Sequence, residues 1–194
     1  MNLPNKLTTL RLLIAIALVV IYSIFKDASW IMWFVGSAFI VGSLTDFLDG
    51  LIARKFNLVT GFGKLMDPLA DKLLVISTII ILIHANIIPT GQFWLVLIVI
   101  ARELLVLGVR LAALEGGGEV VAANWIGKAK TTAQMVSISG LCIIAAICEF
   151  FSMETPFLDT MHWIFLIMFY VSVLLCVIGG VVYFIQNKKY FKMK

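Results

Sequence analysis

Long apolar runs separated by short polar stretches extend along the chain from near its start to residue 185. A helix of about 20 apolar residues crosses the hydrocarbon core of a bilayer, and six runs approach that length. The stretches between them carry the charged residues, glycines and prolines that end helices. The pattern therefore predicts six membrane-spanning helices, over residues 8–25, 30–53, 64–88, 93–114, 125–150 and 161–185.

The composition supports a membrane protein. Of the 194 residues, 62% are hydrophobic and 13% are charged. A soluble domain is nearer half apolar and a quarter charged, so a soluble globule, a disordered tail and a secreted disulfide scaffold are excluded. We expect one all-α membrane domain over residues 1–194, with Pro4 and Asn5 in a short interfacial segment before the first span. No polar mature chain follows the first apolar run, which favours an uncleaved span over a signal peptide.

Basic residues collect on alternate connections and give the chain a formal net charge of +4. Because cytoplasmic loops of membrane proteins are enriched in Lys and Arg, both termini are predicted to be cytoplasmic, which agrees with an even number of spans. The excess forms no clustered basic surface, so no nucleic-acid partner is expected. The basic residues concerned are Lys6, Arg11, Arg54, Lys55, Lys64, Arg110, Lys128, Lys130 and the four lysines within 188–194.

Four aspartates lie in or beside apolar helices, where a carboxylate costs several kcal/mol unless it is compensated. Asp46 and Asp49 are three residues apart, so both lie on one helix face, which Gly50 and Ala53 continue. Gly63, Asp67 and Asp71 follow at intervals of four and form a second stripe. A short connection joins the two helices, and short connections join antiparallel neighbours. The two acidic stripes can then face each other at the cytoplasmic end.

Facing carboxylates repel one another unless positive charge lies between them. Hard divalent cations supply that charge and take oxygen ligands. No His or Cys lies nearby, which favours Mg²⁺ or Mn²⁺ over zinc. Four carboxylates can hold two ions, and paired ions are suited to phosphoryl displacement. A divalent-cation transporter and a non-catalytic scaffold are the alternatives, although transporter sites usually lie near the membrane midplane.

Pro68 restricts the third helix, because proline is tolerated in the first helical turn but not in the interior. Either this helix begins near Lys64, which places Pro68 in its first turn, or it kinks at Pro68; the first option keeps the acidic stripe and is preferred.

Polar residues in the fourth and fifth spans predict a second site. Arg102 and Glu103 are adjacent and are expected to point in different directions on their helix. Lys130 and Gln134 share a face, and Arg110 ends the preceding span on the same side. Arg grips phosphate through two donors and Lys acts as a point charge. We therefore expect a pocket for a phosphate-bearing acceptor, with Arg102, Arg110, Lys128 and Lys130 as its phosphate-binding residues.

The acidic stripes resemble the signature of the CDP-alcohol phosphotransferase family. The matching stretch is Asp46-x-x-Asp49-Gly50-x-x-Ala53-Arg54, eight residues, then Gly63-x-x-x-Asp67-x-x-x-Asp71, with nine fixed positions over 26 residues. The resemblance implies a six-span homodimer with a dinuclear Mg²⁺ site. It also implies transfer of a substituted phosphate from a CDP-activated donor to an alcohol, with release of CMP.

The resemblance also assigns roles to individual positions. Asp46, Asp49 and Asp67 match metal-binding aspartates, and Asp71 matches the general base, which is sometimes a metal ligand. The positions that match the CDP site are Asn5, Thr8, Gly50, Ala53, Arg54 and Gly63.

The acceptor is indicated by further similarity. The Arg102-Glu103 block, the Gly-Lys-x-Lys-Thr-Thr-x-Gln run over 127–134 and the opening Asn5-x-x-Thr8-x-x-Arg11 are similar to bacterial members of this family. Those members transfer the phosphatidyl group of CDP-diacylglycerol to glycerol 3-phosphate and release CMP. The similarity implies these two substrates and a bacterial inner membrane with the active site at the cytoplasmic face. Other acceptors, namely inositol phosphate, serine or phosphatidylglycerol, are the alternative.

Overall fold

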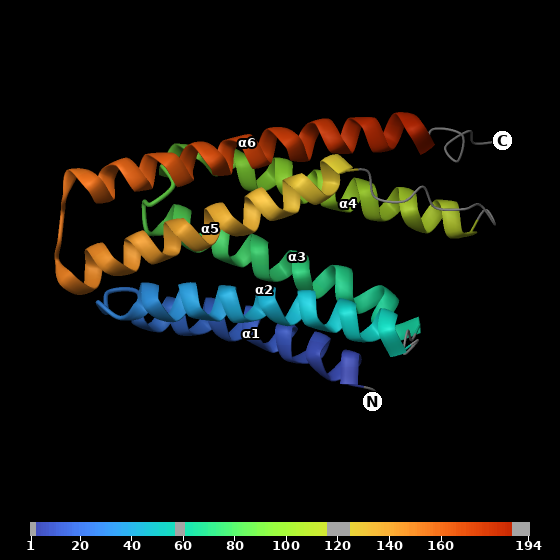
Figure 1. Cartoon of the computed structure of the whole chain (residues 1–194), viewed down its shortest axis with the longest axis horizontal. Helices are drawn as coiled ribbons and strands as arrows, with labels where there is room; N and C mark the ends of the chain where they lie inside the picture. The colour runs from blue at the N-terminus through green and yellow to red at the C-terminus, as the bar shows by residue number, and fades with distance from the viewer. Residues whose placement is uncertain (1–2, 57–60, 116–124, 188–194) are drawn as a thin grey trace.

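Six long helices make up the described part of the chain in the structure, a computed structural model (Figure 1). It describes residues 3–56, 61–115 and 125–187, with side chains for 7–46, 66, 69–108 and 127–186. No strand occurs in these segments. The elements are α1 (Leu3–Phe25), α2 (Ile31–Phe56), α3 (Gly61–His84), the short 3-10 helix η1 (Thr90–Gln92), α4 (Trp94–Glu115), α5 (Trp125–Phe151) and α6 (Pro156–Asn187).

The predicted all-α fold is confirmed, and each predicted apolar run coincides closely with one helix. Helix α1 begins at Leu3, so Pro4 and Asn5 belong to the same helix as the apolar stretch Leu7–Phe25, which they precede, and their interfacial position stays a prediction. One local prediction is wrong. Helix α3 begins at Gly61 and not near Lys64 as predicted, so Pro68 lies beyond the first turn of the helix. Proline has no N–H, so α3 continues there with one backbone hydrogen bond fewer.

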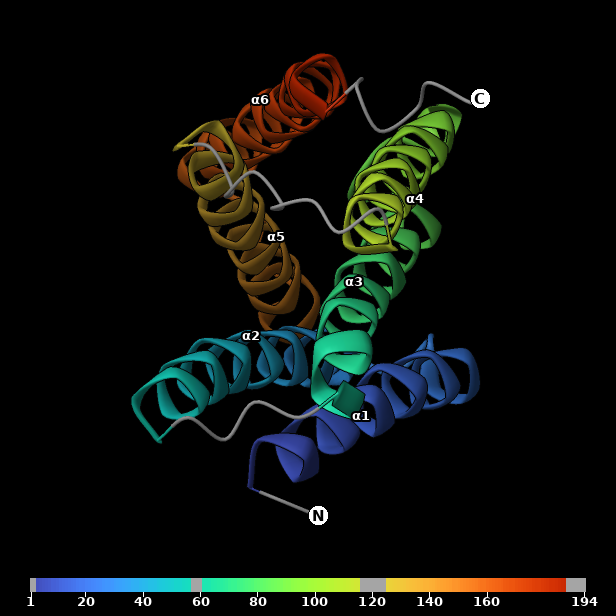
Figure 2. The same cartoon turned by 90° about the vertical axis from the view of Figure 1, so that its right-hand side faces the viewer.

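Successive helices run in opposite directions, so the chain alternates between two ends of the bundle (Figure 1). The start of α1 and the end of α6 lie at the same end, on the right of Figure 1, which we call the N/C end. Viewed from that end, α1, α2 and α3 form one side, and α5 pairs with α6 (Figure 2). Helix α4 packs against α6 and more lightly against α3.

Local backbone and side-chain hydrogen bonds at the opposite end explain where α3 ends and where α6 begins. Helix α3 ends before Asn86, whose positive φ of 58° is the left-handed conformation common after a helix. The Ile87 amide donates back to the Leu82 carbonyl at 2.9 Å and closes that end. Helix α6 begins after Thr155, whose hydroxyl accepts from the Leu158 amide at 3.3 Å as an N-terminal cap. These turns make the reversals that bring the six helices together.

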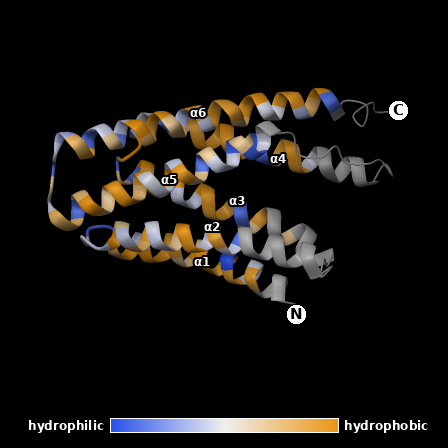
Figure 3. Cartoon of the chain, in the orientation of Figure 1, coloured by the Kyte–Doolittle hydropathy of each residue, from blue (hydrophilic) through white to orange (hydrophobic). Residues whose placement is uncertain are grey.

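The helices are apolar on both their inner and outer faces. One buried cluster includes Leu18, Phe39, Leu82, Leu141 and Phe169 and fills the space between the helices. Large apolar side chains are also exposed on the outside of the bundle. Much of the described ribbon has the orange colour of hydrophobic residues in Figure 3. A helix that is apolar all round suits a membrane.

Four stretches of the described residues are long and apolar enough to cross a bilayer. They are Leu7–Phe25, Thr90–Gly108, Gly127–Phe151 and Pro156–Gln186. The apolar part of α2, Ile31–Asp46, is shorter. The described part of the chain is therefore all-helical, and its apolar helices are those of a membrane protein.

Glycines allow two of the helix contacts to be close. A Cβ at Gly36 would lie 3.2 Å from Cys142 Cβ on α5, and one at Gly140 would lie 2.4 Å from the Phe165 ring on α6. Small residues serve close packing in membrane bundles in this way.

Candidate active site

Arg11 and Asp46 form an ion pair between α1 and α2. Arg11 Nη1 lies 2.9 Å from Asp46 Oδ1, and Arg11 Nε donates to the Gly42 carbonyl at 3.2 Å. The Arg11 side chain is fully buried, whereas 36% of the Asp46 side chain is exposed. Arg11 therefore fixes Asp46 from the inside and leaves part of its carboxylate accessible.

Asp71, on α3, presents an oxygen without a partner. Its Oδ1 is buried and makes no hydrogen bond among the described residues. The carboxylate interacts electrostatically with Asp46, Arg11, Lys72 and Glu103. A buried carboxylate oxygen without a donor is costly, particularly near a second carboxylate. A hard divalent cation prefers oxygen ligands, and the carboxylates of Asp46 and Asp71 are of the kind that it binds.

The other two predicted metal ligands, Asp49 and Asp67, have side chains outside the described set. Their helices place Asp49 three residues after Asp46 on α2 and Asp67 four residues before Asp71 on α3. Among the described side chains, no three acidic, His or Cys residues gather around a point that could hold a metal. The four-aspartate site therefore stays a prediction. Also outside the described side chains are the predicted CDP-binding positions Asn5, Gly50, Ala53, Arg54 and Gly63.

Thr8, also predicted to bind CDP, is described and only 2% exposed. It lines a small hollow of about 90 Å³ between α1 and α3, with Leu12, Met66 and Leu69 among its other walls. The structure thus places Thr8 between these two helices and away from the large cavity described next.

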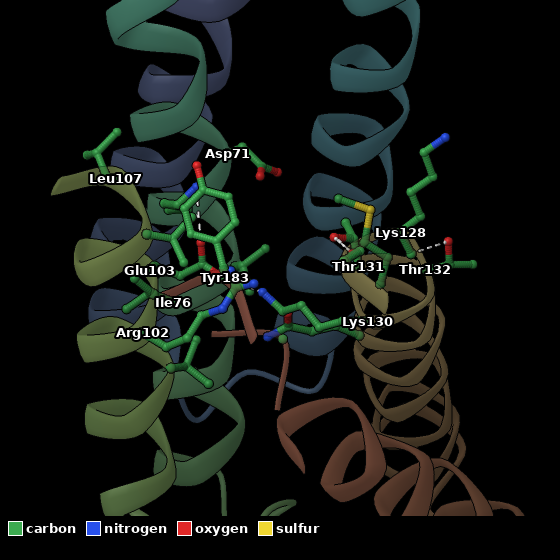
Figure 4. A pocket seen from close by; sticks show the side chains of 18 of the residues that line it. Asp71, Ile76, Arg102, Glu103, Leu107, Lys128, Lys130, Thr131, Thr132 and Tyr183 are labelled. Carbon is green, nitrogen blue, oxygen red and sulfur yellow. Dashed lines mark hydrogen bonds and ion pairs between the residues drawn. The ribbon is translucent and has the colours of Figure 1, made fainter. Parts of the chain in front are cut away.

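A cavity of about 540 Å³ lies between α3, α4, α5 and α6 (Figure 4). Four basic and two acidic side chains line it, which leaves two positive charges in excess. A partly enclosed site with this excess attracts anions. The charged residues of the lining are Asp71, Lys72, Arg102, Glu103, Lys128 and Lys130.

Glu103 is the centre of the charged network in this cavity and is only 7% exposed. Its Oε1 accepts from Arg102 Nη1 at 2.9 Å and from Lys130 Nζ. Its Oε2 lies 3.1 Å from Lys72 Nζ. Arg102 Nε also donates to the Cys176 carbonyl at 3.1 Å. One carboxylate thus connects α3, α4 and α5, and Arg102 extends the network to α6.

The prediction that Arg102 and Glu103 point in different directions is wrong, because they form an ion pair. Adjacent positions do diverge at the backbone, but both side chains are long enough to bend toward the same cavity. Figure 4 shows Arg102 and Lys130 approaching each other from facing helices.

The predicted phosphate-binding residues differ in accessibility. Arg102 and Lys130 both line the cavity, and Lys130 is only 7% exposed because it is paired with Glu103. Lys128 lines the cavity and is exposed, whereas the side chain of Arg110 is outside the described set. Gln134 shares the cavity face with Lys130 as predicted, and its buried Nε2 has no partner among the described residues.

Three features of the site were not predicted from the sequence. Arg11 was not expected to pair with Asp46, because that contact joins two helices. Lys72 beside Asp71 was visible as a charge in an apolar run and could have been included. Tyr183 and Gln186 line the cavity from α6, where no charged residue marked a site.

A model of the family described as CDP-alcohol phosphatidyltransferase matches residues 1–178. The chain belongs to this family. The resemblance inferred from the nine-residue signature is therefore confirmed. CDP-alcohol phosphatidyltransferases generally use divalent metals, which agrees with the oxygen donors of Asp46 and Asp71.

Similar curated proteins carry the name CDP-diacylglycerol–glycerol-3-phosphate 3-phosphatidyltransferase. The protein of this name from Bacillus subtilis (strain 168) is 42% identical over 196 residues, which cover 96% of this chain and 95% of the relative. The one from Rickettsia bellii (strain RML369-C) is 37% identical over 192 residues, which cover 98% and 97%. The one from Escherichia coli (strain K12) is 35% identical over 145 residues, which cover 72% and 76%. Apolar helices and bacterial relatives together indicate a bacterial membrane protein.

Proposed function

We propose that this chain transfers the phosphatidyl group from CDP-diacylglycerol to sn-glycerol 3-phosphate, yielding phosphatidylglycerol phosphate and CMP. The observation that carries the proposal is a single cavity that contains Asp71 and a net positive lining. An alcohol that bears a phosphate fits this combination, because its anion can bind the basic side chains while its hydroxyl faces Asp71. The names of the similar bacterial proteins support the same donor and acceptor.

The acceptor phosphate is assigned to the basic residues of the cavity. A phosphate monoester carries nearly two negative charges at neutral pH, which matches the excess of two positive charges in the lining. Arg102 and Lys130 line the cavity from facing helices, and Lys128 lines it from the exposed side. Arg110, near the end of α4, is assigned to the same phosphate, although its side chain is outside the described set. Charge-assisted hydrogen bonds of this kind are strong and directional.

The metal site is assigned to Asp46, Asp49, Asp67 and Asp71, which would hold two Mg²⁺ ions, with Mn²⁺ as a substitute. When bound, such ions neutralise the charge of the donor's pyrophosphate as the bond to CMP breaks. The CDP moiety is assigned to Gly50, Ala53, Arg54 and Gly63, with Asn5 and Thr8 from α1.

Asp71 is the proposed general base. Its carboxylate accepts the proton of the acceptor's 1-hydroxyl as that oxygen attacks the phosphorus bonded to diacylglycerol, and CMP leaves with the electrons of the broken P–O bond. A carboxylate is a weak base, so close positioning and electrostatic stabilisation supply much of the acceleration. The described cavity lining contains no Ser, Cys or His, which favours direct displacement over a covalent intermediate.

The proposed setting is the bacterial inner membrane, with six spans and both termini in the cytoplasm. Asp46 and Asp71 lie toward the N/C end of their helices, and basic residues border that same end in the sequence. The positive-inside tendency then places the active site at the cytoplasmic face. We further propose a homodimer.

One experiment tests the acceptor. The purified chain is incubated with CDP-diacylglycerol, Mg²⁺ and one alcohol at a time, and CMP release is followed. We expect release with glycerol 3-phosphate to exceed that with inositol phosphate, serine or phosphatidylglycerol by at least about tenfold, since one buried charged contact gives such discrimination. Faster CMP release with another alcohol would mean that this alcohol, and not glycerol 3-phosphate, is the acceptor. Uptake of Mg²⁺ into vesicles without CMP release would favour the transporter.

A further inference from the structure

Glu103 places a single negative charge among three positive ones inside the membrane domain. Arg102 and Lys130 share its Oε1, and Lys72 lies beside its Oε2. Glu103 and Lys130 are each only 7% exposed, so water screens these charges weakly. Without the carboxylate, three cations from α3, α4 and α5 would repel one another and separate.

Two of the three cations are also connected to residues outside the network. Lys72 directly follows Asp71 on α3, so the ion pair of Lys72 with Glu103 also limits the movement of Asp71, the proposed base. Arg102 is held on its other side by the Cys176 carbonyl at 3.1 Å. Its aliphatic part crosses α6 at Gly180, where a Cβ would lie 2.8 Å from Arg102 Cγ. Glu103 is thus the common contact between the phosphate-binding side of the cavity and the helix that carries Asp71.

We propose that Glu103 is a positioning residue that holds Lys72, Arg102 and Lys130 in the arrangement that directs a phosphate-bearing alcohol toward Asp71. The proposal rests on the proposed function, since it concerns the acceptor of that reaction. Glu103 itself does not contact the acceptor phosphate, because two anions repel. Its contribution is made through the cations that it holds.

This role can be distinguished from a simple effect of charge. If Glu103 only reduced the positive charge of the cavity, its removal would strengthen anion binding and lower the KM for glycerol 3-phosphate. If Glu103 positions the cations, its removal weakens binding and raises that KM. The two roles therefore predict opposite signs for one measured quantity.

The test uses Glu103→Gln, which keeps the shape and removes the charge. We expect the KM for glycerol 3-phosphate to rise about tenfold or more, because hydrogen bonds to charged groups are worth that factor. The KM for CDP-diacylglycerol should stay within about twofold, since its proposed contacts lie elsewhere. Glu149→Gln is the matched control, because Glu149 is an exposed residue near the end of α5 that is far from the cavity.

A second pair of variants tests the route through Lys130. Lys130→Gln alone should raise the KM for glycerol 3-phosphate. In the double variant Lys130→Gln/Glu103→Gln, the total fold increase of this KM should be smaller than the product of the two single-variant increases, as expected for residues in one network. Effects that multiply fully would overturn the proposal. Glu103→Asp keeps a shorter carboxylate and should raise the KM severalfold, by less than Glu103→Gln does.

The possible failures are separable. If the wild-type chain releases no CMP with glycerol 3-phosphate, the proposed function has failed. If the wild-type chain is active but Glu103→Gln leaves its KM for glycerol 3-phosphate unchanged or lower, or raises both KM values equally, the positioning role is wrong. If Glu103→Gln does not fold, Glu103→Asp decides, and a KM equal to or below the wild-type value would overturn the proposal.

Discussion

Arg11 Nη1 lies 2.9 Å from Asp46 Oδ1, although the two residues come from different helices. The Arg11 side chain is fully buried, and its Nε binds the Gly42 carbonyl of α2, so its position is fixed by two contacts. Asp46 therefore has a permanent positive neighbour on its buried side. The part of its carboxylate that stays exposed is the part available to a metal ion.

Arg11→Met should destabilise the protein. It leaves Asp46 without its buried counterion and costs roughly 2 kcal/mol, below the usual cost of breaking a buried pair because Asp46 is partly exposed. We expect the midpoint of thermal unfolding in detergent to fall by several degrees. Arg11→Lys should recover part of the loss, and Lys26→Met, at an exposed position, serves as the control. An unchanged midpoint in Arg11→Met would contradict the structural role.

Asp71→Asn should reduce turnover by a factor of about 10² to 10⁴, the range that general bases contribute. The amide cannot accept the proton of the acceptor hydroxyl. CMP release measures the loss, and metal-dependent binding of CDP-diacylglycerol should be partly retained. Asp27→Asn, at an exposed residue in the α1–α2 connection, is the matched control. Normal turnover in Asp71→Asn would remove this residue from the base role.

Removal of divalent metal should abolish CMP release, and added Mg²⁺ or Mn²⁺ should restore it. An ion that binds only the folded state also raises stability by mass action. Mg²⁺ should therefore raise the thermal midpoint of the wild-type chain and raise it less in Asp46→Asn. Full activity in the presence of a strong chelator would argue against metal-assisted transfer.

Gly180→Ala should disturb Arg102. The added Cβ would lie 2.8 Å from Arg102 Cγ, so the side chain must shift and its hydrogen bond to the Cys176 carbonyl is strained. We expect a KM for glycerol 3-phosphate raised severalfold and a stability loss of about 1 kcal/mol, typical of overpacking.

Gly108→Ala is the matched control for that change, because among the described residues no atom outside the adjoining stretch of its own helix lies within 4 Å of a Cβ at Gly108. Alanine is the better helix former, so this variant should be as stable as the wild type or slightly more so. Equal effects of the two substitutions would mean that crowding at Gly180 is unimportant.

The helical fold could be predicted well from the sequence because each long apolar run marks the position of one membrane helix. The predicted helix boundaries differ from the structure where a helix begins with polar residues. Helix α1 includes Pro4 and Asn5, and α3 starts before Lys64, because a helix can continue beyond its apolar part once its backbone is hydrogen-bonded. Hydropathy carries no information about that extension.

For the site, the sequence predicted only which residues of a single helix lie on the same face. Lys130 and Gln134 do line the same cavity, as their spacing indicated. The contacts of Arg11 with Asp46 and of Glu103 with Lys72 join separate helices, and they depend on how those helices cross. Spacing along one helix does not contain that information.

Part of the cavity wall on α6 lies beyond the stretch matched by the family model. That stretch is 1–178, and Gly179, Val182, Tyr183 and Gln186 line the cavity from the part of α6 that follows. Substitutions at these four positions would therefore reshape one wall of the cavity without changing any aspartate of α2 or α3.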